Sequence, residues 1–109
     1  MPVGALTSIG HRLSGIVLAT SVPLGVWLLA LSLRDEQAYA EVTGLLGHPA
    51  LRATLAIVAW ALAHHVLAGI RHLLSDFDVG STLRSARRSA WLVNLGAVVV
   101  ALVAAAFLL

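Results

Sequence analysis

Three long stretches of this 109-residue sequence contain no aspartate, glutamate, lysine or arginine. They run from residue 13 to 33, from 53 to 70 and from 89 to 109, so they are 21, 18 and 21 residues long. A helix needs about 20 mostly apolar residues to cross the hydrocarbon core of a bilayer. The length of these stretches therefore favours a chain that crosses a membrane three times.

Composition argues against the alternative, a very oily soluble helical bundle. Hydrophobic residues make up 60% of the chain, against roughly 45–50% in a soluble domain, and the mean hydropathy is +0.95. None of the three stretches shows the polar face that a water-facing helix needs. The sequence predicts an all-α fold, an integral membrane bundle of three transmembrane helices in a single domain, at about 8–33, 50–75 and 89–109.

The absence of cysteine and the placement of the basic residues exclude several classes of protein. With no cysteine in the chain, disulfides, iron–sulfur clusters and thiolate zinc sites are excluded within it. The seven basic residues are all arginines, and they mark helix ends and connections rather than one basic face, so nucleic-acid binding is not expected. The first apolar stretch is too long for a signal peptide and lacks a small-residue cleavage site.

Arginines at the helix ends predict the orientation. Five of them lie at ends that share one side of the membrane: Arg12, Arg71, Arg84, Arg87 and Arg88. The opposite side has Arg34 and Arg52, and Pro49 is well placed to begin the second helix there. Because basic residues concentrate on the cytoplasmic side, we expect the N-terminus and the loop 76–89 in the cytoplasm and the C-terminus outside. Residues 34–49 are expected to form the other loop.

Ionisable residues gather on one side of the second predicted helix. At about 100° per residue, four positions fall within about 60° of one another. They are His65, Gly69, His72 and Asp76. His64 and Arg71 form a second stripe about 100° away. A lone histidine that only hydrogen-bonds a neighbouring helix would be unremarkable, but a whole ionisable stripe in a membrane usually faces a cofactor, a cavity or a partner.

The first stripe suits a haem better than a small metal ion. His65 and His72 are about 10.5 Å apart along a helix axis, whereas zinc ligands lie within about 2.1 Å of the ion. A zinc or copper site built from this helix alone is therefore not expected. One histidine can supply an axial ligand to haem iron, and Gly69, one turn along, lets a flat ring approach the backbone. His72 and Arg71 lie two turns along, where propionates would reach the membrane surface.

The first predicted helix has polar residues at the same membrane face, in the segment SIGHRLSG. Ser8 and Arg12 are four residues apart, so a hydroxyl and a guanidinium share one side of a helix start. This pair suits hydrogen bonding to a ligand that carries a carbonyl group. The plainer alternative is a helix-capping serine followed by an interfacial arginine.

The two helices carry two spaced patterns. The first is a serine, two residues, His-Arg, one residue and a serine, here Ser8, His11, Arg12 and Ser14. The second is a histidine, three residues, a small residue, an aliphatic residue, Arg-His and then an aspartate, here His65, Gly69, Ile70, Arg71, His72 and Asp76. With the three-helix layout, they resemble the cytochrome b membrane-anchor subunit of succinate dehydrogenase, the respiratory complex II. The resemblance covers nearly the whole chain, although seven residues precede Ser8 here and family members often carry a longer N-terminal arm.

The resemblance implies a role for each matching residue. His65 would be an axial ligand of haem b, and the second ligand would be a histidine of a second anchor subunit. The quinone site would be lined by Ser8, Arg12 and Asp76. The surroundings of the haem and its propionates would include His11, Gly69, Arg71 and His72. His64 lies outside the pattern and receives no role.

The resemblance also implies partners and a place in metabolism. The chain would lie in the bacterial inner membrane, hold haem b jointly with the second anchor subunit, and dock an iron–sulfur subunit and a flavoprotein subunit that oxidise succinate in the tricarboxylic acid cycle. Electrons would then reduce a quinone near the cytoplasmic surface. A trimer of the four-subunit complex is one assembly that the resemblance allows. Two alternatives stay open: the anchor of a fumarate reductase, and a cofactor-free helical scaffold or transporter subunit.

Overall fold

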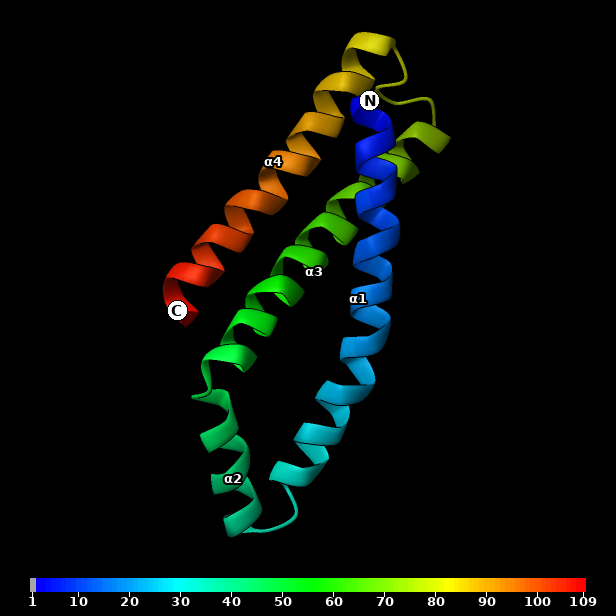
Figure 1. Ribbon diagram of the computed structural model, residues 1–109. Helices are drawn as coiled ribbons and strands as arrows, with labels where there is room; N and C mark the ends of the chain where they lie inside the picture. Colours follow the sequence, from blue (N-terminus) through cyan, green and yellow to red (C-terminus); the bar gives the residue numbers. More distant parts are fainter. Residues whose placement is uncertain (1) are drawn as a thin grey trace.

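The computed structural model describes residues 2–109, which form four helices and no strand. The helices are α1 (Val3–Ser32), α2 (Glu36–Leu46), α3 (Pro49–Asp76) and α4 (Leu83–Leu108). Helices α1, α3 and α4 are each long and apolar enough to cross a membrane. The prediction of an all-α fold with three transmembrane helices is therefore confirmed (Figure 1).

One connection differs from its prediction. Residues 34–49 were expected to form a loop, and most of them form the helix α2 instead. Asp35 caps this helix, since its Oδ1 accepts a hydrogen bond from the backbone N–H of Ala38 at 2.7 Å. Ala38 and Val42 are buried against the rest of the chain, and α2 packs against α1 and α3, which gives this short helix the tertiary contacts it needs. Helix α3 then begins at Pro49, one residue before the predicted range of about 50–75.

The two outer helices begin earlier than expected. Helix α1 begins at Val3 rather than near Ser8, and α4 begins at Leu83 rather than near Ser89. Thr82 caps α4, because its hydroxyl oxygen accepts a hydrogen bond from the backbone N–H of Ser85 at 3.3 Å. Arginine is a good helix former, so the polar segment that carries Arg84 stays helical, and the loop shrinks to residues 77–82.

The bundle is held together by small side chains rather than by a large apolar core. Each membrane helix buries one triplet of residues spaced i, i+3 and i+7, which places the triplet on one side of a helix. The triplets are Thr7, Gly10 and Ser14 in α1, Ala61, His64 and Ala68 in α3, and Ala90, Val93 and Ala97 in α4. Small residues at such positions let membrane helices approach closely. Helix α3 is the middle element, because it packs against both α1 and α4.

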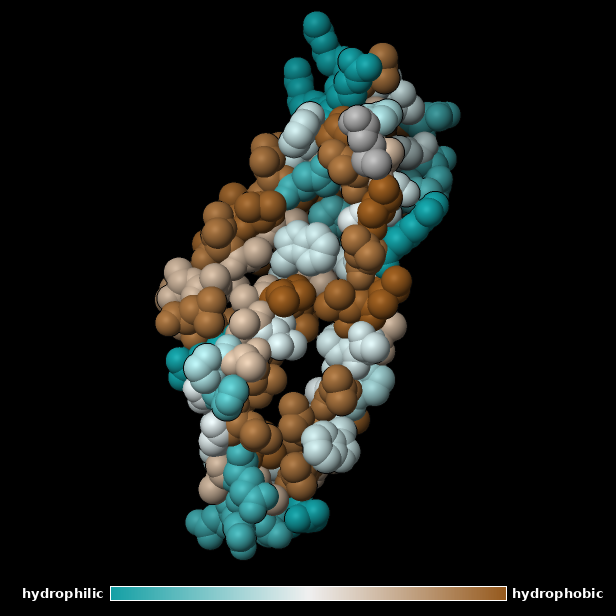
Figure 2. Space-filling view, in the orientation of Figure 1, coloured by the Kyte–Doolittle hydropathy of each residue, from teal (hydrophilic) through white to brown (hydrophobic). Residues whose placement is uncertain are grey.

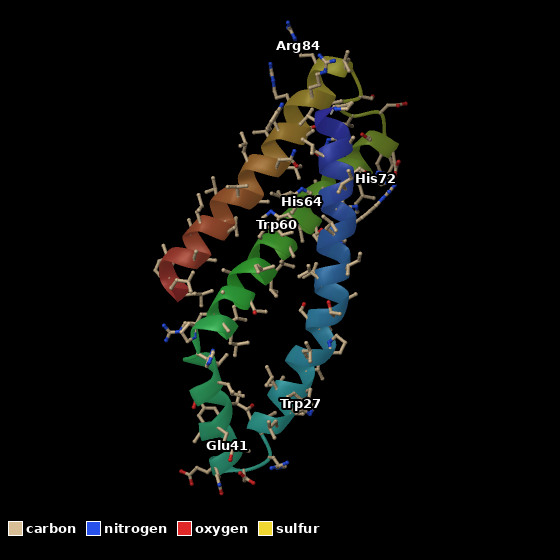
Figure 3. The ribbon with its side chains drawn as sticks, viewed as in Figure 1. Trp27, Glu41, Trp60, His64, His72 and Arg84 are labelled. Atoms are coloured by element: carbon tan, nitrogen blue, oxygen red, sulfur yellow. The ribbon has the colours of Figure 1, made fainter. Side chains whose placement is uncertain are left out.

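The large apolar side chains point outward. Figure 2 shows a hydrophobic middle section with hydrophilic residues at both ends, and the longest dimension of the chain is 56 Å. A bilayer is about 40–45 Å thick with its headgroups, so the polar ends reach water while the exposed apolar middle meets lipid or other subunits. Figure 3 places Arg84 at one end and Glu41 at the other.

A methyl group at Gly10 should destabilise the bundle. A Cβ built there would lie 2.6 Å from both Cε1 and Nε2 of His64, inside van der Waals contact. Overpacking of this kind typically costs about 1–3 kcal/mol, so Gly10→Ala should lower the melting temperature of the purified protein. Gly25→Ala in the same helix is the matched control, since nothing lies within 4 Å of its added methyl. Equal melting temperatures for the two variants would contradict this packing.

Candidate functional site

His65 presents one ring nitrogen to α1 and leaves the other one free. Its Nδ1 lies 3.1 Å from Oγ of Ser14 and 3.3 Å from the backbone oxygen of His11. The Ser14 hydroxyl donates its own hydrogen to that backbone oxygen at 2.8 Å, so the hydrogen of the His65 contact belongs to Nδ1. Within residues 2–109 the structure gives Nε2 of His65 no hydrogen-bond partner.

The surroundings of His65 fit an axial ligand of haem iron. A metal-binding histidine usually donates its other N–H to a hydroxyl or carbonyl, which fixes the tautomer and the ring orientation. The ring also stacks on that of His11, with the centroids 4.3 Å apart and 28° between the planes. Gly15 allows α1 to come this close, since a Cβ there would lie 3.3 Å from Cε1 of His65. One turn further on α3, a Cβ on Gly69 would meet nothing within 4 Å, so this face of the helix is open.

A small polar pocket lies one to two turns from His65, between α1 and α3. Its volume is about 80 Å³, and its lining is Thr7, Ser8, His11, Ala68, Arg71 and His72. Four residues singled out in the sequence therefore meet there: Ser8 and His11 from α1, and Arg71 and His72 from α3. These four residues offer the hydroxyl of Ser8, two imidazoles and a guanidinium to one ligand, beside the hydroxyl of Thr7.

Arg71 is fixed mainly by α4. Its Nε donates a hydrogen bond to Oγ of Ser89 at 3.0 Å, and its Nη2 donates one to the backbone oxygen of Ala86 at 3.2 Å. Both acceptors are neutral, so the guanidinium keeps its full positive charge at the edge of the pocket. The sequence placed Arg71 and His64 on one stripe, and both residues do contact α4.

Arg12 and Asp76 stand apart from the pocket lining, and both are exposed. Asp76 lies one turn beyond His72, with its Oδ2 3.9 Å from Nε2 of that histidine. Arg12 lies one turn beyond Ser8 on α1, and no acidic residue among residues 2–109 pairs with it. The structure thus brings Ser8 to the pocket and leaves Arg12 and Asp76 at the outer surface near it.

Sequence reasoning missed a second polar cluster, which lies on the buried side of α3. His64 is only 3% exposed, and its Nε2 lies 3.1 Å from Oδ1 of Asn94 in α4. Thr7 of α1 approaches the same oxygen at 3.2 Å. The available signal was Asn94 itself, the one amide side chain inside the third apolar stretch, since polar residues inside a membrane segment are costly and mark contacts or function.

Comparison with known proteins places this architecture in a family. Over residues 1–105 the chain matches the family described as succinate dehydrogenase/fumarate reductase transmembrane subunit. It belongs to that family. The resemblance seen in the two sequence patterns is therefore confirmed, and the three long apolar helices are those of a multi-pass transmembrane subunit.

Three relatives of this transmembrane subunit are named succinate dehydrogenase cytochrome b556 subunit. The protein of Paracoccus denitrificans is 33% identical over 105 residues, which cover 93% of this chain and 78% of the relative. That of Coxiella burnetii is 34% identical over 93 residues, covering 84% and 74%. That of Rickettsia conorii is 29% identical over 96 residues, covering 88% and 74%. The family match leaves no support for the alternative of a transporter subunit.

Proposed function

We propose that the chain is the membrane-anchor subunit of a succinate:quinone oxidoreductase, in which it binds haem b jointly with a second anchor subunit and forms part of the quinone-reduction site. The observation that carries the proposal is the free Nε2 of His65 beside the pocket shared by Ser8, His11, Arg71 and His72. An imidazole held by its Nδ1 is a suitable iron ligand, and a cationic pocket next to it suits propionates.

His65 is the axial ligand in this proposal, and the haem supplies one-electron redox chemistry when bound. Ser14 and the backbone oxygen of His11 hold the ring through Nδ1, which leaves Nε2 as the nitrogen available to the iron. Arg71 provides positive charge for the propionates, His72 and His11 provide N–H donors, and Gly69 leaves the helix surface open. His64 is 3% exposed and already bonded to Asn94, so it would not hold the iron, and a second ligand would come from the other anchor subunit.

Ser8, Arg12 and Asp76 are the proposed quinone-site residues. The Ser8 hydroxyl and the Arg12 guanidinium lie on one side of α1 and can donate hydrogen bonds to a quinone carbonyl. Reduction of a quinone takes up protons as well as electrons. The exposed pair of His72 and Asp76 lies near the same end of α3, where it can pass protons from water to the site.

The names of the relatives support succinate oxidation as the direction of the reaction, and they support a complex with further subunits. All three are named for succinate dehydrogenase, which favours succinate oxidation over the reverse reaction of a fumarate reductase. The proposed complex contains a flavoprotein subunit and an iron–sulfur subunit, which oxidise succinate and pass electrons on to the membrane. The chain's exposed apolar surface then meets lipid and the second anchor subunit, and a trimer is one assembly open to the four-subunit complex.

A visible spectrum of the purified complex tests the function. Reduced with succinate, the complex should show the absorption bands of a b-type haem in the reduced-minus-oxidised difference spectrum, and it should transfer electrons from succinate to a quinone. A complex built on a cofactor-free scaffold, with no haem on any subunit, would show no such bands.

We expect the N-terminus in the cytoplasm and the C-terminus outside. Five arginines lie at the end where α1 and α4 begin and α3 ends, against two at the other end, and basic residues concentrate on the cytoplasmic side. A phosphatase that is active only outside the cytoplasm should therefore be active when fused after Leu109. Activity of a cytoplasm-only fluorescent reporter at that position would reverse the orientation and move the proposed quinone site to the outer surface.

A further inference from the structure

The cluster of His64, Asn94 and Thr7 joins all three membrane helices at one oxygen atom. Nε2 of His64 in α3 lies 3.1 Å from Oδ1 of Asn94 in α4. Oγ1 of Thr7 in α1 lies 3.2 Å from the same oxygen and shares its one hydrogen between it and the backbone oxygen of Val3 at 3.0 Å. Thr7 is 2% exposed and His64 is 3% exposed, so water does not compete for these contacts. Since Oδ1 of Asn94 can only accept, Nε2 of His64 carries a hydrogen.

Close packing holds the His64 ring in place. The backbone of α1 lies against it at Gly10, where even a methyl group would come within 2.6 Å of two ring atoms. Trp60, one turn earlier on α3, lies against another side, with the ring centroids 5.4 Å apart. Figure 3 shows Trp60 and His64 on the stretch of α3 that lies between α1 and α4. The ring cannot turn without moving a helix.

The cluster includes an unpaired polar atom that lowers the stability of the fold. The other ring nitrogen of His64, Nδ1, is buried without a hydrogen-bond partner within residues 2–109. An unpaired buried polar atom destabilises a fold, and a leucine of similar volume would avoid the penalty. Buried polar groups that persist in spite of their cost often fix one register or rotation of a helix against its neighbours.

We infer that His64 is a positioning residue: through Asn94 and Thr7 it fixes the rotation of α3, and thereby directs Nε2 of His65 out of the bundle toward the haem. Consecutive residues on an α-helix are about 100° apart, so the direction of His64 determines that of His65. With His64 locked between α1 and α4, His65 faces the side of α1 where Ser14 and the His11 carbonyl hold its Nδ1. This inference rests on the proposed function, because it assigns His65 to the iron.

Variants of the cluster in the assembled, haem-containing complex test the inference. His64→Leu keeps the volume and removes the hydrogen bond, while His64→Gln keeps a donor near the position of Nε2. Asn94→Leu removes the shared acceptor and leaves His64 in place. The readouts are the low-field electron paramagnetic resonance line of the low-spin ferric haem, which responds to the orientation of the axial imidazole planes, and the affinity of the haem-depleted complex for haem.

We expect His64→Leu to keep a low-spin haem, because His65 is intact, but to shift the low-field line and weaken haem affinity about threefold. That factor corresponds to the average interhelical hydrogen bond in a membrane, about 0.6 kcal/mol, at 1.4 kcal/mol per tenfold. Asn94→Leu should give the same shift, the double variant should be no worse than either single one, and His64→Gln should restore the wild-type line.

Each contrary result has a distinct meaning. An unchanged line and affinity in both leucine variants would overturn the positioning role, as would effects that simply add in the double variant. If the complex with His64→Leu does not assemble, Asn94→Leu and the milder Thr7→Val test the positioning role instead. Wild-type spectra in both of these variants would overturn that role. Loss of the haem signal in His64→Leu, with its retention in His65→Ala, or a wild-type complex without haem, would instead refute the proposed function and this inference with it.

Discussion

Replacing His65 with alanine should abolish the low-spin haem signal of the assembled complex. His65 has its Nδ1 held by Ser14 and the His11 carbonyl, while its Nε2 is free at a partly buried position on α3. A six-coordinate b-type haem needs an axial ligand from each side, so removing this imidazole leaves the iron one ligand short. Electron paramagnetic resonance and the reduced-minus-oxidised visible spectrum of the purified complex would measure the loss.

His48→Ala is the control for this experiment. His48 caps α3 at the opposite end of the chain, where its Nδ1 accepts a hydrogen bond from the backbone N–H of Ala50 at 3.2 Å. Its loss should cost a helix cap and leave the haem spectrum as in the wild type. A low-spin signal that survives in His65→Ala and disappears in His48→Ala or in a variant of His11 would refute the ligand assignment.

The membrane helices could be predicted because a bilayer imposes a length on them. A run of 18 to 21 residues without charge has few other uses in a protein of this size. The helix ends were harder to predict, because a helix does not stop where the hydrocarbon stops. Thr82 starts α4 by capping it, and the arginines that follow are compatible with helix. Charge therefore marks the edge of the membrane and not the end of the helix.

The helix α2 was missed for a related reason. Its segment is short and contains Asp35, Glu36 and Glu41, so it reads as a polar connection. Two local signals were present: an aspartate at the capping position with a glutamate after it, and apolar residues at Ala38 and Val42, four apart. Short helices depend on tertiary contacts more than on propensity, and the sequence does not reveal that α1 supplies this contact.

At the site, helical geometry predicted the relative directions of the side chains on α3, but not which helices those side chains would contact. The angle of about 100° between successive residues separated His64 from His65 and put His64 with Arg71. Which helix each stripe would face depends on how α3 rotates between α1 and α4, and that rotation is a property of the packed bundle. His64 proved to be buried and His65 partly exposed. The two adjacent histidines therefore have different surroundings, which the sequence alone does not show.

Arg12→Leu should reduce the rate of quinone reduction by at least tenfold and leave succinate oxidation by an artificial electron acceptor intact. Arg12 is exposed one turn from Ser8, and within residues 2–109 it has no acidic partner that would neutralise its charge. Loss of a hydrogen bond from a charged donor costs about 1.5–3 kcal/mol, and each 1.4 kcal/mol is a factor of about ten. Leucine keeps much of the aliphatic volume, so the comparison isolates the guanidinium.

Arg34→Leu is the matched control for Arg12, because it makes the same substitution at the opposite end of α1. Arg34 is exposed, and its Nε lies 3.9 Å from the carboxylate of Asp35. Exposed ion pairs of this kind contribute at most about 1 kcal/mol, so both activities should stay near wild type. Unchanged quinone reduction in Arg12→Leu would remove Arg12 from the quinone site. An equal loss of quinone reduction and of succinate oxidation would assign it to assembly with the soluble subunits, since the artificial acceptor bypasses the quinone and still requires an intact complex.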